Sequence, residues 1–227
     1  LRADRQPEHT QIDIEMAFVT EDEVFAVIEG LCSHVFRTCL GVELPVPFAR
    51  LTYREAMDRF GTDKPDRRFE LELVDVSQSA ARTEFGVFKN ALAHGGTVKA
   101  LRVPDGAGKS RKEIDDLEAA ARTYGAKGLA WTKVGSSGPE GGIAKFLGGG
   151  SGVLEELKAE PGDLLLFVAD AWPTACKSLG AVRTVLGEPL VAGRDRDFQF
   201  LWVREFPLFE FNPDRGRWEA AHHIFSM

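Results

Sequence analysis

The first residues whose types and spacing could do chemistry stand near the start of the chain. Gln11, Asp13 and Glu15 alternate with apolar residues over positions 10–18. Because successive side chains of an extended strand point to opposite faces, these three polar side chains would share one face. That face either meets water, as is usual for a half-buried strand, or lines a polar pocket.

Two further groups of polar residues stand at the ends of the chain. Arg2, Arg5 and Gln6 precede the alternating run and would arch over a pocket that the run lined. At the far end stand His222 and His223, which would face opposite sides of a strand. A zinc site there would lack third and fourth ligands. The two histidines are therefore either ordinary polar residues at the end of a strand or contacts to a ligand, and the residues alone do not decide between these.

A glycine-rich stretch at Gly106–Ser110 echoes a phosphate-binding loop, but the full pattern needs a glycine where Val103 stands. We therefore expect Ser110 to cap a helix and no phosphate loop here. The sequence offers no Ser-His-Asp or Cys-His arrangement that a single chain can support. The candidate sites are thus binding sites, and no catalytic side chain is predicted.

The overall composition limits the class of protein. A formal charge of −7 argues against a general polyanion binder, although it leaves room for a locally basic RNA contact. No apolar run reaches the ~18 residues of a membrane span, and no signal peptide opens the chain. The three cysteines show no paired spacing, so we expect reduced thiols in a cytoplasmic protein. The start at Leu1 suggests a fragment.

Local signals predict the elements that must position these residues. Capping boxes open helices after Thr20, Thr52 and Ser110, and Gly41 and Gly61 are placed to end the first two. Strand patterns cover 69–73, 97–103, 128–134 and 164–169, and a helix covers about 174–186. Strands that alternate with helices predict a module with its own core over residues 91–195. The expected fold class is α+β.

Several segments, in order, resemble one family. Residues 1–15, Leu-Arg-Ala-Asp-Arg-Gln-Pro-Glu-His-Thr-Gln-Ile-Asp-Ile-Glu, resemble the second half of motif 2 of a class II aminoacyl-tRNA synthetase, specifically the bacterial-type aspartyl-tRNA synthetase. His9 replaces an aromatic residue there. Residues 61–66 are similar to the family's Gly-Ser-Asp-Lys-Pro-Asp segment. Residues 205–208 and 222–226 resemble its Asp-Phe-Pro-Leu and His-His-Pro-Phe-Thr segments, with Glu205, Ile224 and Ser226 as departures.

The middle of the chain resembles the GAD insertion domain, which such synthetases share with a subunit of an archaeal glutamyl-tRNA amidotransferase. The resemblance lies in residues 99–104, 124–131, 143–147 and 161–169. It implies three parts: a partial class II catalytic domain with an antiparallel sheet at 1–90, an α/β GAD-type insertion domain at 91–195, and the catalytic domain continued at 196–227.

The resemblance implies an aspartate–tRNA ligase. ATP would activate L-aspartate to aspartyl-adenylate, and the aspartyl group would pass to the 3′ end of tRNA(Asp). Positioning and charge neutralisation dominate such chemistry, so no side-chain nucleophile is needed. Mg²⁺ is expected, but its principal ligands in the family lie near motif 3, which this sequence does not contain. The fragment alone is expected to be inactive, and the protein to form a homodimer through regions outside this sequence.

The resemblance also assigns roles to the residues of motif 2. Gln6 would contact ATP, Asp13 would bind the ammonium group of aspartate, and Gln11 would hold or shape that site. Glu15 has no settled role.

At the chain ends, His222 would contact aspartate or its adenylate, with His223 as its supporting neighbour. Arg2 and Arg5 would meet tRNA or ATP phosphates or simply be solvated. Two alternatives remain: a tRNA-binding amidotransferase subunit and an inactive synthetase paralogue. Whether tRNA(Asn) is also charged is left open.

Overall fold

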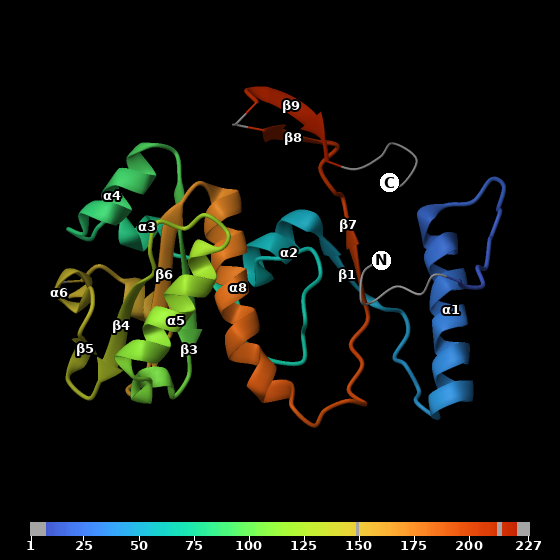
Figure 1. The fold of residues 1–227 in the computed structure, drawn as a ribbon, viewed down its shortest axis with the longest axis horizontal. Helices are drawn as coiled ribbons and strands as arrows, with labels where there is room; N and C mark the ends of the chain where they lie inside the picture. The colour runs from blue at the N-terminus through green and yellow to red at the C-terminus, as the bar shows by residue number, and fades with distance from the viewer. Residues whose placement is uncertain (1–7, 149, 213–214, 222–227) are drawn as a thin grey trace. The chain divides into compact units, whose positions relative to one another are not determined.

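The computed structural model describes residues 8–148, 150–212 and 215–221. The chain divides into two compact units, residues 1–48 and residues 49–227, and each is described here by itself. Figure 1 shows both units, with α1 in the first and the remaining helices and strands in the second. Within the described ranges, no helix is long and apolar enough to span a membrane.

The first unit contains one long helix, α1 (Glu21–Leu40), as the capping box predicts. The Thr20 side chain accepts from the Glu23 amide, and the Glu23 carboxylate accepts from the Thr20 amide at 2.7 Å. Gly41 ends the helix with a φ of 66°, a conformation that glycine adopts at little cost.

The buried face of α1 differs from the expected one. The apolar pattern points to a face that includes Val24, Val27 and Val35, yet these three side chains are exposed. Phe25 and Glu29 are buried instead, and the Glu29 carboxylate accepts from the Phe48 amide at 3.2 Å. In the described part of this unit, only extended segments pack against α1. Most of the apolar surface of the helix is therefore exposed to solvent.

The predicted strand over residues 10–18 is wrong as a strand. The segment has no ladder to any described segment, and residues 8–20 are exposed on both faces, with Ile12 at 69 % exposure. Alternation of polar and apolar side chains specifies a strand only where a neighbouring strand takes up its backbone hydrogen bonds. Without that partner, the alternation leaves an extended segment.

The second unit is built on a five-stranded sheet in which every ladder is antiparallel. In order across the sheet, its strands are β2 (Leu73–Asp75), β3 (Thr97–Val103), β6 (Leu164–Asp170), β4 (Ala130–Gly135) and β5 (Gly138–Glu140). The three apolar runs at 97–103, 128–134 and 164–169 are thereby confirmed as strands. Of the predicted strand at 69–73 only its last residue is in a strand, because the carbonyls of Phe69 and Leu71 accept hydrogen bonds from the Arg183 side chain and not from a neighbouring strand.

Helices cover both faces of this sheet (Figure 1). Alternate residues of β6 enter different cores: Leu164 and Leu166 meet one, and Leu165 and Phe167 the other. One face carries α5 (Arg111–Arg122) and α8 (Trp172–Val191), and the other α3 (Ser77–Ala80), α4 (Gly86–Ala93), α6 (Ala144–Leu147) and α7 (Val153–Glu156). Apolar side chains on both sides explain why these strands read as continuous apolar runs.

Ser110 is the N-cap of α5, so the glycine-rich stretch before it ends in a helix cap as predicted. A short 3₁₀ turn, η1 (Gly106–Gly108), precedes the cap.

Two smaller strand pairs complete the unit. β1 (Ala49–Thr52) runs parallel to β7 (Leu201–Arg204), and β8 (Phe209–Asn212) pairs antiparallel with β9 (Arg217–Ala220). The predicted return strand at Trp218 is confirmed in β9. Mixed helices and antiparallel sheets confirm the α+β class.

Helix α2 (Tyr53–Phe60) lies between β1 and α8. Gly61 ends it with a φ of 71° and packs directly on the backbone of α8 at Gly180. A β-carbon on either glycine would collide with main-chain atoms of the other segment. Only glycine at both positions lets the turn after α2 approach the helix this closely.

Arg183 of α8 forms hydrogen bonds with the backbone of residues 66–71, which follow this turn. Its guanidinium is buried and donates to the carbonyls of Asp66 at 2.7 Å, Phe69 at 3.2 Å and Leu71. It also lies over the Phe69 ring at 4.2 Å from the centroid. Burial lowers the pKa of Arg183 to about 10, and nearby carboxylates oppose that shift, so the group stays charged at neutral pH.

We expect Arg183→Met to lower the free energy of unfolding by about 3 kcal/mol, because three carbonyls, two of them buried, lose a charged donor. Arg183→Lys keeps the charge but loses the forked geometry, so it should fall between wild type and Met. Urea unfolding measures both variants. A methionine variant within about 0.5 kcal/mol of wild type, the usual range of a neutral surface change, would contradict this role.

Candidate functional site

The three polar residues of the opening segment lie together but are open to solvent. Gln11 Nε2 donates to Asp13 Oδ1 at 2.6 Å, and both side chains are exposed, as is Glu15. That this polar face lines a ligand pocket therefore stays a prediction.

The other predicted site residues lie outside the described ranges. They are Arg2, Arg5, Gln6, His222 and His223.

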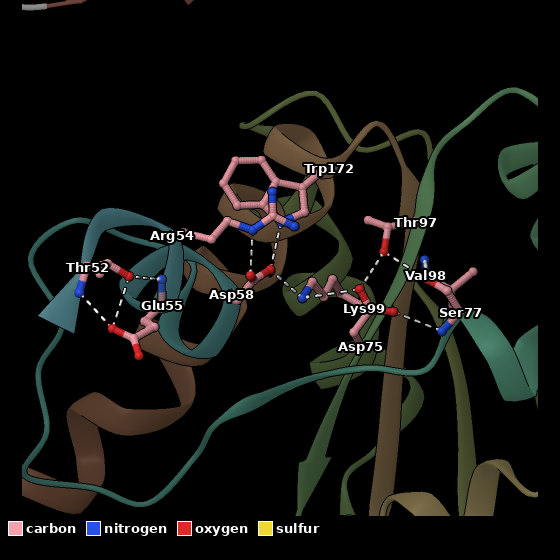
Figure 2. A network of polar contacts seen from close by, with 10 residues as sticks. All are labelled: Thr52, Arg54, Glu55, Asp58, Asp75, Ser77, Thr97, Val98, Lys99 and Trp172. Atoms are coloured by element: carbon pink, nitrogen blue, oxygen red, sulfur yellow. Dashed lines mark hydrogen bonds and ion pairs between the residues drawn. The ribbon is translucent and has the colours of Figure 1, made fainter. Parts of the chain in front are cut away.

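A polar network of the second unit centres on Asp58 in α2, and the sequence analysis did not predict it. Figure 2 shows the Asp58 carboxylate between three donors from three different elements. Lys99 Nζ and Trp172 Nε1 each donate to Oδ1 at 2.7 Å, and Arg54 Nε donates to Oδ2 at 2.7 Å. The Arg54 guanidinium also stacks over the Trp172 ring at 4.1 Å from the centroid.

Lys99 is the buried member of this network, with a side chain only 2 % exposed. It lies on β3, on the face that also carries Leu101, and reaches a second carboxylate, Asp75 of β2, at 3.4 Å. Asp75 also accepts from the Ser77 amide at 3.0 Å and from Thr97 Oγ1 at 2.9 Å. A buried ammonium needs such partners, since an unpaired charge would be expelled or neutralised.

Both carboxylates are held in the ionised form. Burial by itself would raise the pKa of Asp58, but hydrogen bonds from Lys99, Trp172 and Arg54 outweigh it, and the pKa is lowered. Burial would also raise the pKa of Asp75, but hydrogen bonds from Ser77 and Thr97 outweigh it, and this pKa is lowered too. Because both carboxylates accept several hydrogen bonds and are held ionised, we assign the network a structural role, in which it fixes α2 against β3 and α8.

One signal could have pointed to the network. Lys99 stands between Val98 and Ala100 in the predicted strand 97–103, on the face that carries Leu101 in the core. A lysine at such a position implies a buried partner. Its carboxylate partners, Asp58 and Asp75, lie 41 and 24 residues before it in the chain, and local patterns do not connect them.

A pocket of about 430 Å³ lies beside the network, where α2, α8 and the segment after β7 meet. Tyr53 lines it, and its hydroxyl donates to Glu210 Oε1 at 3.5 Å. Burial raises the pKa of Tyr53, and the charges of Glu210 and Asp63 add to the shift.

Neither the pocket nor the rest of the described chain shows a metal or thiol centre. In residues 8–148, 150–212 and 215–221, no group of three or more His, Cys, Asp or Glu side chains could hold a metal ion. The three cysteines are free thiols, as expected. Burial raises the pKa of Cys176 to about 12, so this thiol stays protonated and unreactive.

Comparison with known families identifies the central part of the chain first. Residues 88–179 match the GAD domain family. This range contains β3, β4, β6 and the start of α8, the elements that form the two cores of the sheet.

The whole chain is also similar to bacterial proteins named aspartate–tRNA(Asp/Asn) ligase. It is 50 % identical to that of Moorella thermoacetica over 229 aligned residues, which cover 100 % of this chain and 38 % of the relative. The protein of Treponema denticola is 48 % identical over 99 % of this chain, and that of Bacillus subtilis 50 % identical over 100 %, each with 39 % of its own length covered. The predicted resemblance to bacterial-type aspartyl-tRNA synthetases is thus confirmed, and the chain spans about two fifths of these curated relatives.

We expect Lys99→Met to lower the free energy of unfolding by about 2 kcal/mol, because Asp58 and Asp75 lose the cation that they share. The two carboxylates are partly exposed, which keeps the loss below that of a fully buried pair. Lys89→Met is the matched control, since Lys89 pairs with Glu84 at an exposed site. Urea unfolding in which both variants lost equal stability would refute the role given to Lys99.

The lowered pKa of Asp58 predicts a pH dependence with a definite sign. The stability that Asp58 contributes is fully present above the ordinary carboxyl pKa and is lost as pH falls through the lower, folded value. Asp58→Asn does not titrate, so its stability deficit should be largest at neutral pH and shrink below about pH 4. Urea unfolding of both proteins at several pH values tests this, and a deficit independent of pH would contradict it.

Proposed function

We propose that this chain is part of a bacterial-type aspartate–tRNA ligase. The supporting observation is the identity of about 50 % to such ligases along the whole chain, which extends on both sides of the GAD domain. An amidotransferase subunit is not favoured, because the matched region includes the catalytic segments that flank this domain. The relatives' names add tRNA(Asn) to tRNA(Asp) as a candidate substrate.

The proposed domain organisation places residues 1–90 and 196–227 in the catalytic domain and residues 91–195 in the insertion domain. The family match at 88–179 supports the central domain. In this scheme α2 belongs to the catalytic domain, and the network of Asp58, Lys99 and Trp172 fastens the two domains together.

The proposed reaction has two steps. A carboxylate oxygen of L-aspartate attacks the α-phosphorus of ATP, which forms aspartyl-adenylate and releases pyrophosphate. A ribose hydroxyl at the 3′ end of tRNA(Asp) then attacks the acyl carbon, which forms the ester and releases AMP. Both steps need aligned reactants and neutralised charge, and neither needs a nucleophile from the protein.

Within this reaction, Asp13 is the proposed ligand of the aspartate ammonium group. The hydrogen bond from Gln11 supports this role, because it orients the Asp13 carboxylate and leaves its second oxygen for a cation. Gln6 is proposed to contact ATP. His222, with His223 beside it, is proposed to contact aspartate or its adenylate.

The remaining assignments are less specific. Arg2 and Arg5 are proposed to meet tRNA or ATP phosphates, and Glu15 has no assigned contact. Mg²⁺ is proposed to accompany ATP; the described residues show no group of three or more potential metal ligands, and no step is derived through the ion. A cytoplasmic homodimer completes the proposal.

Aspartate-dependent ATP–pyrophosphate exchange by the complete gene product tests this function. We expect Asp13→Ala to reduce exchange about 100-fold, the equivalent of a lost charge-assisted hydrogen bond of about 3 kcal/mol. His222→Ala should reduce it in the same direction. The controls are Asp116→Ala and His34→Ala, which change exposed residues of α5 and α1.

Absence of exchange in the wild-type protein would refute the proposed activity and favour an inactive paralogue. Normal exchange in both site variants would refute only the assignment of Asp13 and His222.

A further inference from the structure

The pocket beside α2 has the size of a ligand site. It lies where the turn after α2, the middle of α8 and residues 206–210 meet, and its volume of about 430 Å³ falls within the ~300–1,000 Å³ range of small-molecule pockets. None of the assignments above uses it. The question is which ligand its side chains would recognise.

The spacing along α8 explains why the pocket exists. Lys177, Ala181 and Thr184 are four and three residues apart, so they share one face of the helix and line the pocket together. Gly180 lies on the same side and receives the turn at Gly61. Small residues at 180 and 181 leave a hollow that a lysine and a threonine border.

Two lysines on the pocket wall have no partner for their charge. The ammonium groups of Lys64 and Lys177 form no ion pair or hydrogen bond with any residue that the structure describes, and both side chains are exposed. Among the exposed lysines, Lys89 pairs with Glu84 at 2.5 Å, whereas Lys112, like the two pocket lysines, pairs with no described carboxylate; what distinguishes Lys64 and Lys177 is that both border one pocket. Two unpaired cations on one pocket favour an anionic group such as phosphate.

An aromatic ring borders the same pocket. Tyr124, just beyond the end of α5, is 56 % exposed although it is a large side chain. An exposed ring beside cations offers a surface on which a planar base stacks, a contact worth about 1–3 kcal/mol per base.

Acidic groups complete the lining around the Tyr53 hydroxyl. Glu210 accepts its hydrogen bond, and the charges of Glu210 and Asp63 both raise the pKa of Tyr53, so both carboxylates lie close to this phenol. Carboxylates accept hydrogen bonds from sugar hydroxyls and repel phosphate. The pocket therefore combines acceptors for hydroxyls, cations for phosphate and a ring for a base.

We propose that this pocket binds one ribonucleotide of an RNA strand. Lys64 and Lys177 contact its phosphate, Tyr124 stacks on its base, and Asp63 and Glu210 accept from the ribose hydroxyls. The proposal rests on the proposed function, in which tRNA is the RNA that reaches this protein. It also agrees with the net charge of −7, because the basic contact is local.

Binding of tRNA to the complete gene product at several salt concentrations tests the pocket. Lys64→Ala/Lys177→Ala should weaken binding at least tenfold, and it should reduce the slope of log affinity against log salt by about 1.5, for two lost phosphate contacts. Tyr124→Ala should weaken binding severalfold without changing that slope. Lys112→Ala, an exposed lysine of α5 outside the pocket, is the control and should change neither quantity.

Binding and slope equal to wild type in the double lysine variant would overturn the proposal. A parallel titration with AMP separates RNA from a free nucleotide: lost AMP binding with unchanged tRNA binding would also overturn it. Pyrophosphate exchange by the wild-type protein needs no tRNA, so its presence or absence judges the proposed function separately.

Discussion

The second unit depends on the burial of one charge. Lys99 lies in a strand whose neighbours are apolar, and its ammonium group is stable there only because Asp58 and Asp75 converge on it. The two carboxylates come from α2 and β2, so the position of each element is set by the need to neutralise a cation on β3. A well-packed apolar side chain would place no such demand on α2.

Two further contacts act on the same neighbourhood from α8. Gly180 admits the turn at Gly61 to van der Waals contact with the helix backbone, and Arg183 holds the carbonyls that follow. These contacts place residues 61–71 along the helix. Because the turn contacts α8 closely only near Gly180, a pocket remains beside this contact, and Lys64 and Lys177 border it.

Local signals in the sequence predicted the elements well, and tertiary relationships poorly. The helix that begins after Ser110 follows from a capping box, which needs only four residues. The segment 10–18 has the alternation of a strand but no described partner, and Phe69 has the pattern of a strand but packs in the core without joining a ladder. Asp58 could not be linked to Lys99 from the sequence, because their contact joins segments 41 residues apart. The candidate site rested on family resemblance, since its residues carry no distinctive local pattern.

The open row of apolar side chains in residues 10–18 has a consequence for handling the chain. Ile12, Ile14 and Phe18 are exposed in an extended segment whose backbone donors and acceptors are unpaired within the described residues. Such a segment favours edge-to-edge association between molecules, and the charges of Asp13 and Glu15 oppose it. This segment therefore lowers the solubility of the polypeptide most at high salt, which screens those two charges.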